Sequence, residues 1–195
     1  MWATTLHFEA GQSVSVDQKE ETIRQIVAIE WEMFHSVKAS EPAVCQQSPG
    51  VFRLMRWMSH SVLPESVLES YSRDLNEAVE QNRNPMTEKY ARMQGIIPPL
   101  KTNVKIDEIV AVESRWMQDV ARLYPKTFQW DPQGFSLYES CELETYSDRT
   151  IDLYHEAVTK ARDQGRNLVE ERYANLFRRL GYTSIAAKEE KSGLG

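Results

Sequence analysis

Two glutamates lie where a helical chain normally carries apolar side chains. Glu30 is at the centre of an apolar stripe with helical spacing, and Glu113 holds the same position in a second stripe 83 residues later. A charge at a core-facing position is costly unless it is paired or neutralised. Two interpretations follow. Each glutamate forms a buried ion pair that holds the fold together, or the two carboxyls face a central cavity with raised pKa values and act as general acid and general base.

Residues that recur at the same offset are candidate partners for these glutamates. Arg83 and Arg166 are the predicted cations of the ion pairs. They also precede helix starts, where free backbone N–H groups and an arginine can hold an anion. The asparagines that follow them are predicted N-caps. The predicted substrate-binding set consists of Arg83, Arg166, Asn84 and Asn167, to which the tryptophans Trp31 and Trp116 are added as possible pocket aromatics.

Aromatic residues offer two further roles. Tyr90 and Tyr173 fall on the apolar face of the last helix in each repeat, where a hydroxyl bonded to a buried glutamate would form a proton relay. The same positions also suit core aromatics whose hydroxyl is satisfied. Trp31 and Trp116 could line a pocket for an aromatic or polycyclic ligand, and core packing explains them equally well.

A di-metal carboxylate bundle is a weaker alternative. Glu32 and His35, like Asp152 and His155, have the i, i+3 spacing of carboxylate-bridged di-iron sites. Glu32, however, lies about 200° around the helix from Glu30, at 100° per residue, and is expected to face solvent. Neither histidine recurs in the other repeat, so neither a metal nor another cofactor is predicted.

Composition places the chain among ordinary globular proteins. It has 195 residues and a net charge of −6, which gives no electrostatic footprint for nucleic acid or an anionic membrane. No stretch approaches the ~18 apolar residues of a membrane span, and the first residues lack the features of a signal peptide. Cys45 and Cys141 make neither a zinc cluster nor a disulfide framework, and nothing supports Cys45 as a catalytic thiol. We expect a cytoplasmic monomer or homodimer with a small-molecule ligand.

The two glutamates belong to a gapless internal repeat. Of the 69 residue pairs from 23/106 to 91/174, 19 are identical, among them most of Ile26–Glu30 and Ile109–Glu113. Such repetition indicates two copies of one supersecondary unit. Because helices of this amphipathicity cannot bury their apolar faces alone, we expect the units to share one core about a pseudo-twofold axis.

Apolar spacing and helix breakers predict an all-α fold of about eight helices, four in each unit. In the first unit the expected elements are a helix at 17–37, a loop at 38–50, helices near 52–58 and 68–78, and a fourth helix from Pro85. The predicted organisation is an N-terminal arm at 1–16, repeats at 17–100 and 101–185 that form one compact domain, and a flexible tail at 186–195.

Several blocks of the sequence resemble one known family. They are Ile26-Val-Ala-Ile-Glu-Trp-Glu-Met-Phe34, Leu68-Glu-Ser-Tyr71, Arg83-Asn-(x)3-Glu-Lys-Tyr-Ala-Arg-Met93, Glu142-Leu-Glu-Thr-Tyr-Ser147 and Gly165-Arg-Asn167 through Gly181-Tyr182. Over about residues 20–190 the chain is similar to the domain-of-unknown-function family 4125. That family's pattern has a Gly-Gly-Arg element before Cys-Gln, whereas this chain has Glu41-Pro42-Ala43-Val44 before Cys45. The resemblance implies an intracellular helical protein, and it implies no particular activity.

These patterns together predict a small, cofactor-independent enzyme. Glu30, Glu113, Tyr90 and Tyr173 would perform acid–base chemistry, such as cyclisation, dehydration or isomerisation, on a small organic substrate between the two units, as in secondary metabolism. The alternative is a non-catalytic helical module that binds a small molecule or a protein. Carboxyls that open into a cavity would favour catalysis, and carboxyls that close onto arginines would favour a structural role.

Overall fold

The apolar stripes of the sequence fold into helices. The computed structural model describes residues 11–37 and 48–192, with the backbone alone for 11–17, and over these ranges it contains nine helices and no strand. The helices are α1 (Gly11–His35), α2 (Pro49–Ser61), α3 (Glu65–Glu80), α4 (Pro85–Met93), α5 (Val104–Leu123), α6 (Pro132–Leu143), α7 (Asp148–Asp163), α8 (Leu168–Arg179) and α9 (Ile185–Ser192). The all-α class is therefore confirmed.

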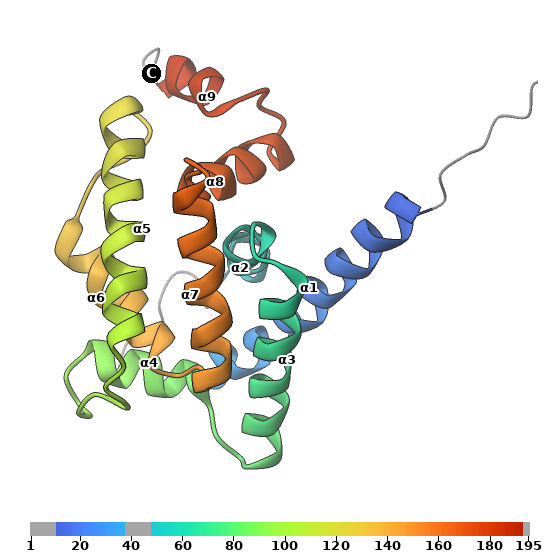
Figure 1. Ribbon diagram of the computed structural model, residues 1–195, viewed down its shortest axis with the longest axis vertical. Coiled ribbons are helices and arrows are strands. Elements are labelled where there is room, and N and C mark those ends of the chain that lie inside the picture. Colours follow the sequence, from blue (N-terminus) through green and yellow to red (C-terminus); the bar gives the residue numbers. More distant parts are fainter. Residues whose placement is uncertain (1–10, 38–47, 193–195) are drawn as a thin grey trace, which may run out of the picture.

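The helices pack in two groups that also contact each other. α1 packs against α2, α3 and α4, and α5 packs against α6, α7 and α8. Contacts between the groups join α3 to α7, α2 to α8 and α4 to α6. Figure 1 shows α5, α7 and α3 side by side, with the first turns of α1 running away from the other helices. The second helix of each group therefore packs against the fourth helix of the other group.

Helix starts recur along the chain at the offset of the sequence repeat. The first residues of α2/α6, α3/α7 and α4/α8 are each 83 residues apart, at Pro49/Pro132, Glu65/Asp148 and Pro85/Leu168. Proline at the first position of a helix loses no hydrogen bond, because the N–H there has no partner within the helix. The repeated proline, Pro49 and Pro132, thus favours the observed start of α2 and α6.

The recurring asparagines are N-caps, as predicted. The side-chain oxygens of Asn84 and Asn167 accept from the backbone N–H three residues on, at 3.0 Å and 2.9 Å. Each side-chain amide also donates to a carbonyl of the first helix in its group, to Met33 at 2.9 Å and to Trp116 at 3.1 Å. Each asparagine therefore satisfies its own helix start and ties it to α1 or α5.

The tryptophans predicted to line a substrate pocket are buried in the core. Trp31 packs on Phe34 and Phe52, with ring centroids 6.4 Å and 5.4 Å away. Trp116 is also part of the continuous apolar core. Their burial favours the interpretation that they are core aromatics.

The two ends of the chain differ from the expected arm and tail. Residues 11–16, which were expected in an N-terminal arm, are the first turns of α1, and residues 1–10 lie outside the described residues. The tail expected from residue 186 is helical as far as Ser192, since α9 spans Ile185–Ser192. Residues 38–47, most of the expected loop and including Cys45, also lie outside the described residues.

The bond from each asparagine to the first helix can be tested by substitution. We expect Asn167→Ala to lower the free energy of unfolding by about 1–2 kcal/mol, because it removes the cap and the bond to the Trp116 carbonyl. Asn167→Ser keeps a capping oxygen but no amide, and should recover about half of the loss. Urea unfolding measures both variants, and Asn84→Ala is the matched change. An unchanged midpoint for Asn167→Ala would contradict this account.

Candidate functional site

Glu30 and Glu113 are both completely shielded from water, as predicted. Glu30 on α1 accepts two hydrogen bonds from Arg56 of α2, from Nε at 2.9 Å and from Nη2 at 2.5 Å. The Tyr71 hydroxyl donates to it at 2.9 Å, and His60 Nε2 lies 3.0 Å from the same oxygen. Burial alone would raise the pKa of Glu30, but Arg56 and His60 outweigh it and lower this pKa to about 2. Glu30 is therefore ionised and closed onto its partners.

A second buried carboxylate shares the same guanidinium. Glu142 of α6 accepts from Arg56 at 2.8 Å and 3.0 Å, from the Tyr146 hydroxyl at 3.0 Å, and from the ammonium of Lys89 on α4. The Lys89 ammonium also lies 3.3 Å from the ring centroid of Tyr138, a cation–π contact. Burial raises the pKa of Glu142, but Arg56 and Lys89 reverse this and hold it well below its usual range. Buried charges thus join α2, α4 and α6, and the shared guanidinium extends the connection to α1.

Glu113 on α5 has fewer partners than Glu30. One of its oxygens, Oε1, accepts from Arg172 Nη2 of α8 at 3.0 Å and from the Tyr154 hydroxyl of α7 at 2.9 Å. The other oxygen and the Nε of Arg172 are buried with no hydrogen-bond partner among the described residues. The pair thus leaves one acceptor and one donor unused, which is costly in a core.

Glu139 of α6 is a second carboxyl beside Arg172. Its Oε1 lies 3.9 Å from Arg172 Nη1. Burial raises the pKa of Glu139 and the charge of Glu113 raises it further, so that it reaches about 8 although Arg172 acts against both. The Glu139 carboxyl therefore holds a proton near neutral pH.

A small cavity lies among these groups, with a volume of about 20 Å³. Its walls come from α2, α6, α7 and α8, and they include His60, Glu139 and Arg172. Such a space holds about one water molecule or one polar atom of a ligand. His60 Nδ1 and Arg172 Nε have no partner among the described residues, whereas Ser59, Tyr138 and Glu139 are partly exposed. The partly exposed residues mark the side on which the cavity approaches solvent.

The arginines predicted to pair with the buried glutamates lie at the surface. Arg83 pairs with Glu88 at 2.8 Å, and Arg166 pairs with Glu171 at 2.6 Å. In each case the arginine precedes a helix and the glutamate lies in its first turn, so the two side chains meet locally. The prediction that Arg83 and Arg166 neutralise the buried glutamates is therefore wrong, and Arg56 and Arg172 do so instead.

The tyrosines that contact the buried glutamates also differ from the predicted pair. The hydroxyls that donate to Glu30 and Glu113 belong to Tyr71 and Tyr154, which recur at the same offset as the glutamates. Burial and the neighbouring glutamate raise the pKa of both hydroxyls well above the usual range, so both stay protonated. Tyr90 and Tyr173 are partly buried and pack on aromatic neighbours, with 5.6 Å and 4.6 Å between ring centroids.

Several residues of the site were missed from the sequence, although two signals were present. Arg56 and His60 lie four residues apart on the buried face of α2, where charged or polar residues need a partner. Glu139 occupies the repeat position of Arg56, and Lys89 and Arg172 share another repeat position. Residues that are identical in both repeats therefore did not include these site residues, because the buried polar positions recur while their residue types change.

One of the two candidate metal-binding pairs, Asp152 and His155, has other contacts in the structure. His155 lies 2.6 Å from Glu108, and Asp152 pairs with Lys105 at 2.7 Å. In the described part of the chain, no three His, Cys, Asp or Glu residues gather so as to hold a metal ion. No helix in the same ranges has the length and apolar character needed to cross a membrane.

Comparison with known proteins yields a match over most of the chain. The family model described as "Protein of unknown function (DUF4125)" matches residues 20–190, the range over which the sequence resembles that family. No curated protein and no solved structure matches the chain significantly. A family is thus identified without an activity, so the function has to be inferred from the site.

The closed ion pair predicts a large cost for neutralising Glu30. Glu30→Gln should lower the free energy of unfolding by about 3–5 kcal/mol at pH 7, because it removes one of the two carboxylates that neutralise the buried Arg56. Wild-type protein should lose this stabilisation as the pH falls from about 4.5 towards 2, since the folded-state pKa of Glu30 is about 2. Chemical unfolding tests this, with the surface change Glu88→Gln as a control that should cost less than about 1 kcal/mol. Equal effects of both changes would contradict the buried ion pair.

The raised pKa of Glu139 predicts the opposite pH dependence. Its folded-state pKa is about 8 and its usual value 4.5, so the folded protein holds a proton that the unfolded chain releases between these pH values. Stability should therefore fall as the pH rises from about 4.5 to 8, by at most about 1.4 kcal/mol per pH unit. Glu139→Gln should remove this decline and match or exceed wild type at pH 8. Parallel pH profiles for wild type and variant would rule out the raised pKa.

Proposed function

The chain belongs to the DUF4125 family of proteins of unknown function, and we propose that it is a small, cofactor-independent enzyme whose acid–base pair is Glu113 and Glu139. The main support is the pKa of Glu139, about 8, beside a cavity the size of one polar atom. A carboxyl that titrates near neutral pH is suited both to donate and to accept a proton. The reaction types that we propose are cyclisation, dehydration or isomerisation of a small organic substrate.

The two carboxyls have complementary states in this mechanism. Protonated Glu139, which lines the cavity, donates its proton to a hydroxyl or carbonyl oxygen of the substrate there. The unpaired oxygen of Glu113 accepts a proton from the substrate, which requires the site to open towards Glu113, because this residue does not itself line the cavity. An isomerisation then returns the pair to its starting state when the proton passes from Glu113 to Glu139. In a dehydration the protonated hydroxyl leaves as water. Arg172 holds Glu113 and stabilises its negative charge.

Glu30 has a different role in this proposal from the catalytic role that the sequence suggested. Its ion pair with Arg56 and its pKa of about 2 make it a poor proton donor at neutral pH. It acts instead as a positioning residue, because it fixes the guanidinium that also holds Glu142 on α6, the helix that carries Glu139. Tyr154 positions Glu113 in the same way, through its hydroxyl.

We further propose that the two helical units are related by a pseudo-twofold axis near the contact between α3 and α7. Helix starts that recur every 83 residues support this relation, as do the reciprocal contacts of α2 with α8 and of α4 with α6. Such an axis would place Arg56 and Glu139 at equivalent positions. The change from Arg56 to Glu139 would then replace the cation of a structural ion pair with a carboxyl whose pKa is raised.

The cavity limits the substrate and its route. A volume of about 20 Å³ accepts one oxygen of the substrate, so the rest of the molecule would lie towards the partly exposed Ser59 and Tyr138.

We place the enzyme in the cytoplasm, which suits the free thiol of the buried Cys141.

A non-catalytic binding module is the second candidate. The tight closure of Glu30 and Glu142 around Arg56 favours it. These carboxylates are engaged in ion pairs and hydrogen bonds within the protein, so they are not directed at a substrate. Under this alternative, Glu139→Gln would leave ligand binding unchanged and no compound would be transformed.

Turnover can be tested without knowing the substrate. Purified protein is incubated with a small-molecule extract in D2O, and mass spectrometry follows compounds that change or gain deuterium, since acid–base chemistry at carbon exchanges protons with solvent. We expect wild type to transform at least one compound, and Glu139→Gln to do so at least about 100-fold more slowly. Glu88→Gln, a surface carboxylate change, should keep the wild-type rate. Equal rates for wild type and Glu139→Gln, or binding without any turnover, would refute the enzyme proposal.

A further inference from the structure

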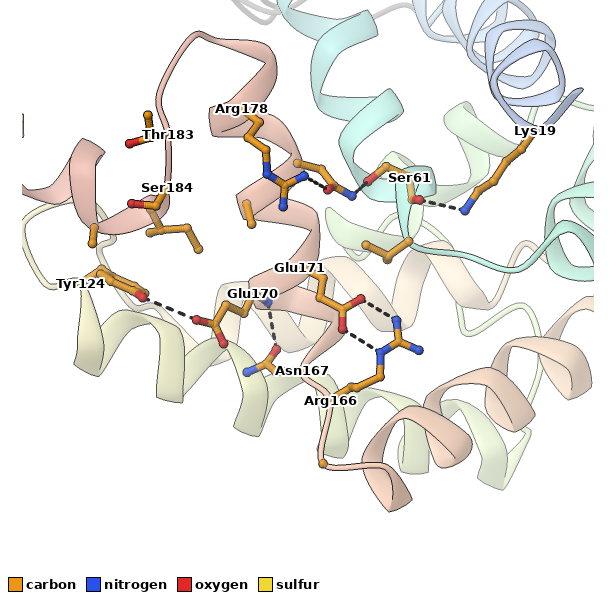
Figure 2. Close-up of a pocket in the computed structure, with 16 residues that line it drawn as sticks. Lys19, Ser61, Tyr124, Arg166, Asn167, Glu170, Glu171, Arg178, Thr183 and Ser184 are labelled. Carbon is orange, nitrogen blue, oxygen red and sulfur yellow. Dashed lines mark hydrogen bonds and ion pairs between the residues drawn. The ribbon is translucent and has the colours of Figure 1, made fainter. Parts of the chain in front are cut away.

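A second pocket lies on the other side of α8 from the buried cavity. It has a volume of about 790 Å³, within the usual range for small-molecule sites. Its walls come from α1, the end of α2, the end of α5, α8 and the start of α9 (Figure 2). Arg172 lines the buried cavity, whereas its neighbours Glu171 and Asn175 line this pocket, so α8 separates the two spaces.

Two cations stand at the ends of one hydrogen-bonded row in this pocket. Lys19 donates to the Ser61 carbonyl at 2.9 Å, Asn175 donates to the Ser61 hydroxyl at 3.0 Å, and Arg178 donates to the Asn175 side-chain oxygen at 2.9 Å. Figure 2 shows Arg178, Ser61 and Lys19 following one another along this wall. The row ties α1, α2 and α8 together and holds both cations on one wall.

Neither cation has an ionic partner among the described residues, in contrast to the other arginine of the pocket. Arg166 is neutralised by Glu171 at 2.6 Å. Lys19 and Arg178 bond only to neutral groups in the described ranges. Lys19 is partly buried, and burial lowers its pKa, while Glu20 and Glu65 support its charge only from a distance. An anion bound here would give Lys19 the counter-charge that it lacks.

The lining as a whole favours an anionic ligand. It contains three cations and two carboxylates, in a chain whose net charge is −6. The remaining carboxylate, Glu170, lies on the opposite side beside Tyr124, at 3.5 Å from its hydroxyl. Thr183 and Ser184 add hydroxyl groups at the rim. Two unpaired cations on one wall match two negative charges, and guanidinium and ammonium groups bind carboxylates and phosphates through charge-assisted hydrogen bonds.

We propose that this pocket binds a small organic dianion, a phosphate monoester or a dicarboxylate, between Lys19 and Arg178. The site is separate from the Glu113–Glu139 pair, so it does not depend on the proposed reaction. The dianion contacts the ammonium of Lys19 and the guanidinium of Arg178. Of the neutral groups between them, the side-chain amide of Asn175 can donate to it, whereas the Ser61 hydroxyl already donates to the Met58 carbonyl at 2.8 Å.

Calorimetric titration of the full chain tests this site with defined probes. They are inorganic phosphate and glycerol phosphate for the phosphate source, succinate for the dicarboxylate source, and acetate and glycerol as singly charged and neutral controls. We expect one saturable site for at least one dianion at pH 7.5, and weaker or no binding of acetate and glycerol. The preferred dianion identifies which of the two sources fits.

Matched variants show whether binding occurs in this pocket. Lys19→Gln and Arg178→Gln retain a side-chain donor for Ser61 and Asn175, and each should weaken binding at least about tenfold, which corresponds to about 1.4 kcal/mol. Lys105→Gln removes a cation elsewhere, on α5, and should bind as wild type does. Thermal melts confirm that the variants are folded. No saturable binding of any dianion to wild type, or equal weakening by Lys105→Gln, would overturn the proposal.

Discussion

A carboxylate that is withdrawn from water needs a cation, and here one guanidinium serves two carboxylates at once. Arg56 forms ion pairs with Glu30 of α1 and Glu142 of α6, and Lys89 of α4 forms a second ion pair with Glu142. All four residues are at least nine-tenths shielded from solvent. Because the cost of burying each charge is offset only when every partner is present, the helices that carry them are fixed in relative position. The site next to Arg172 depends on this arrangement, since Glu142 and Glu139 lie one turn apart on α6.

The two sequence repeats carry different charges at equivalent positions. In the first half, the second helix supplies a cation to the buried glutamate. In the second half, the equivalent position holds Glu139, so Glu113 must take its cation from α8, and Arg172 faces two carboxyls. Burial and the charge of Glu113 raise the pKa of Glu139 to about 8, so this carboxyl holds a proton near neutral pH. A change of charge at one repeat position can thus produce a carboxyl with a raised pKa in an otherwise structural cluster. Candidate functional residues in such a protein are therefore better looked for where the repeats differ than where they are identical.

The sequence predicted which residues lie in the core and which cap helices, but it did not predict which side chains pair with the buried charges. The apolar stripe around Glu30 was enough to place this charge in the core, and the N-caps followed from residue types at helix starts. The partner could not be placed in this way, because Arg83 has a glutamate within local reach at Glu88 and remains at the surface. Arg56 reaches the core only because α2 packs against α1, which no spacing rule specifies. Glu139 was missed for a further reason: its pKa depends on three helices that meet around one cation.

The most direct measurement of this account is the titration of the Glu139 carboxyl itself, by carbon NMR of protein with labelled glutamate and with Glu139→Gln for assignment. The account predicts a pKa near 8 in wild type, since burial and the charge of Glu113 both raise it. It also predicts a fall towards the usual value of 4.5 in Glu113→Gln, where the second negative charge is absent. A Glu139 pKa near 4.5 in wild type would contradict the protonated Glu139 carboxyl at neutral pH and, with it, the proposed acid–base pair.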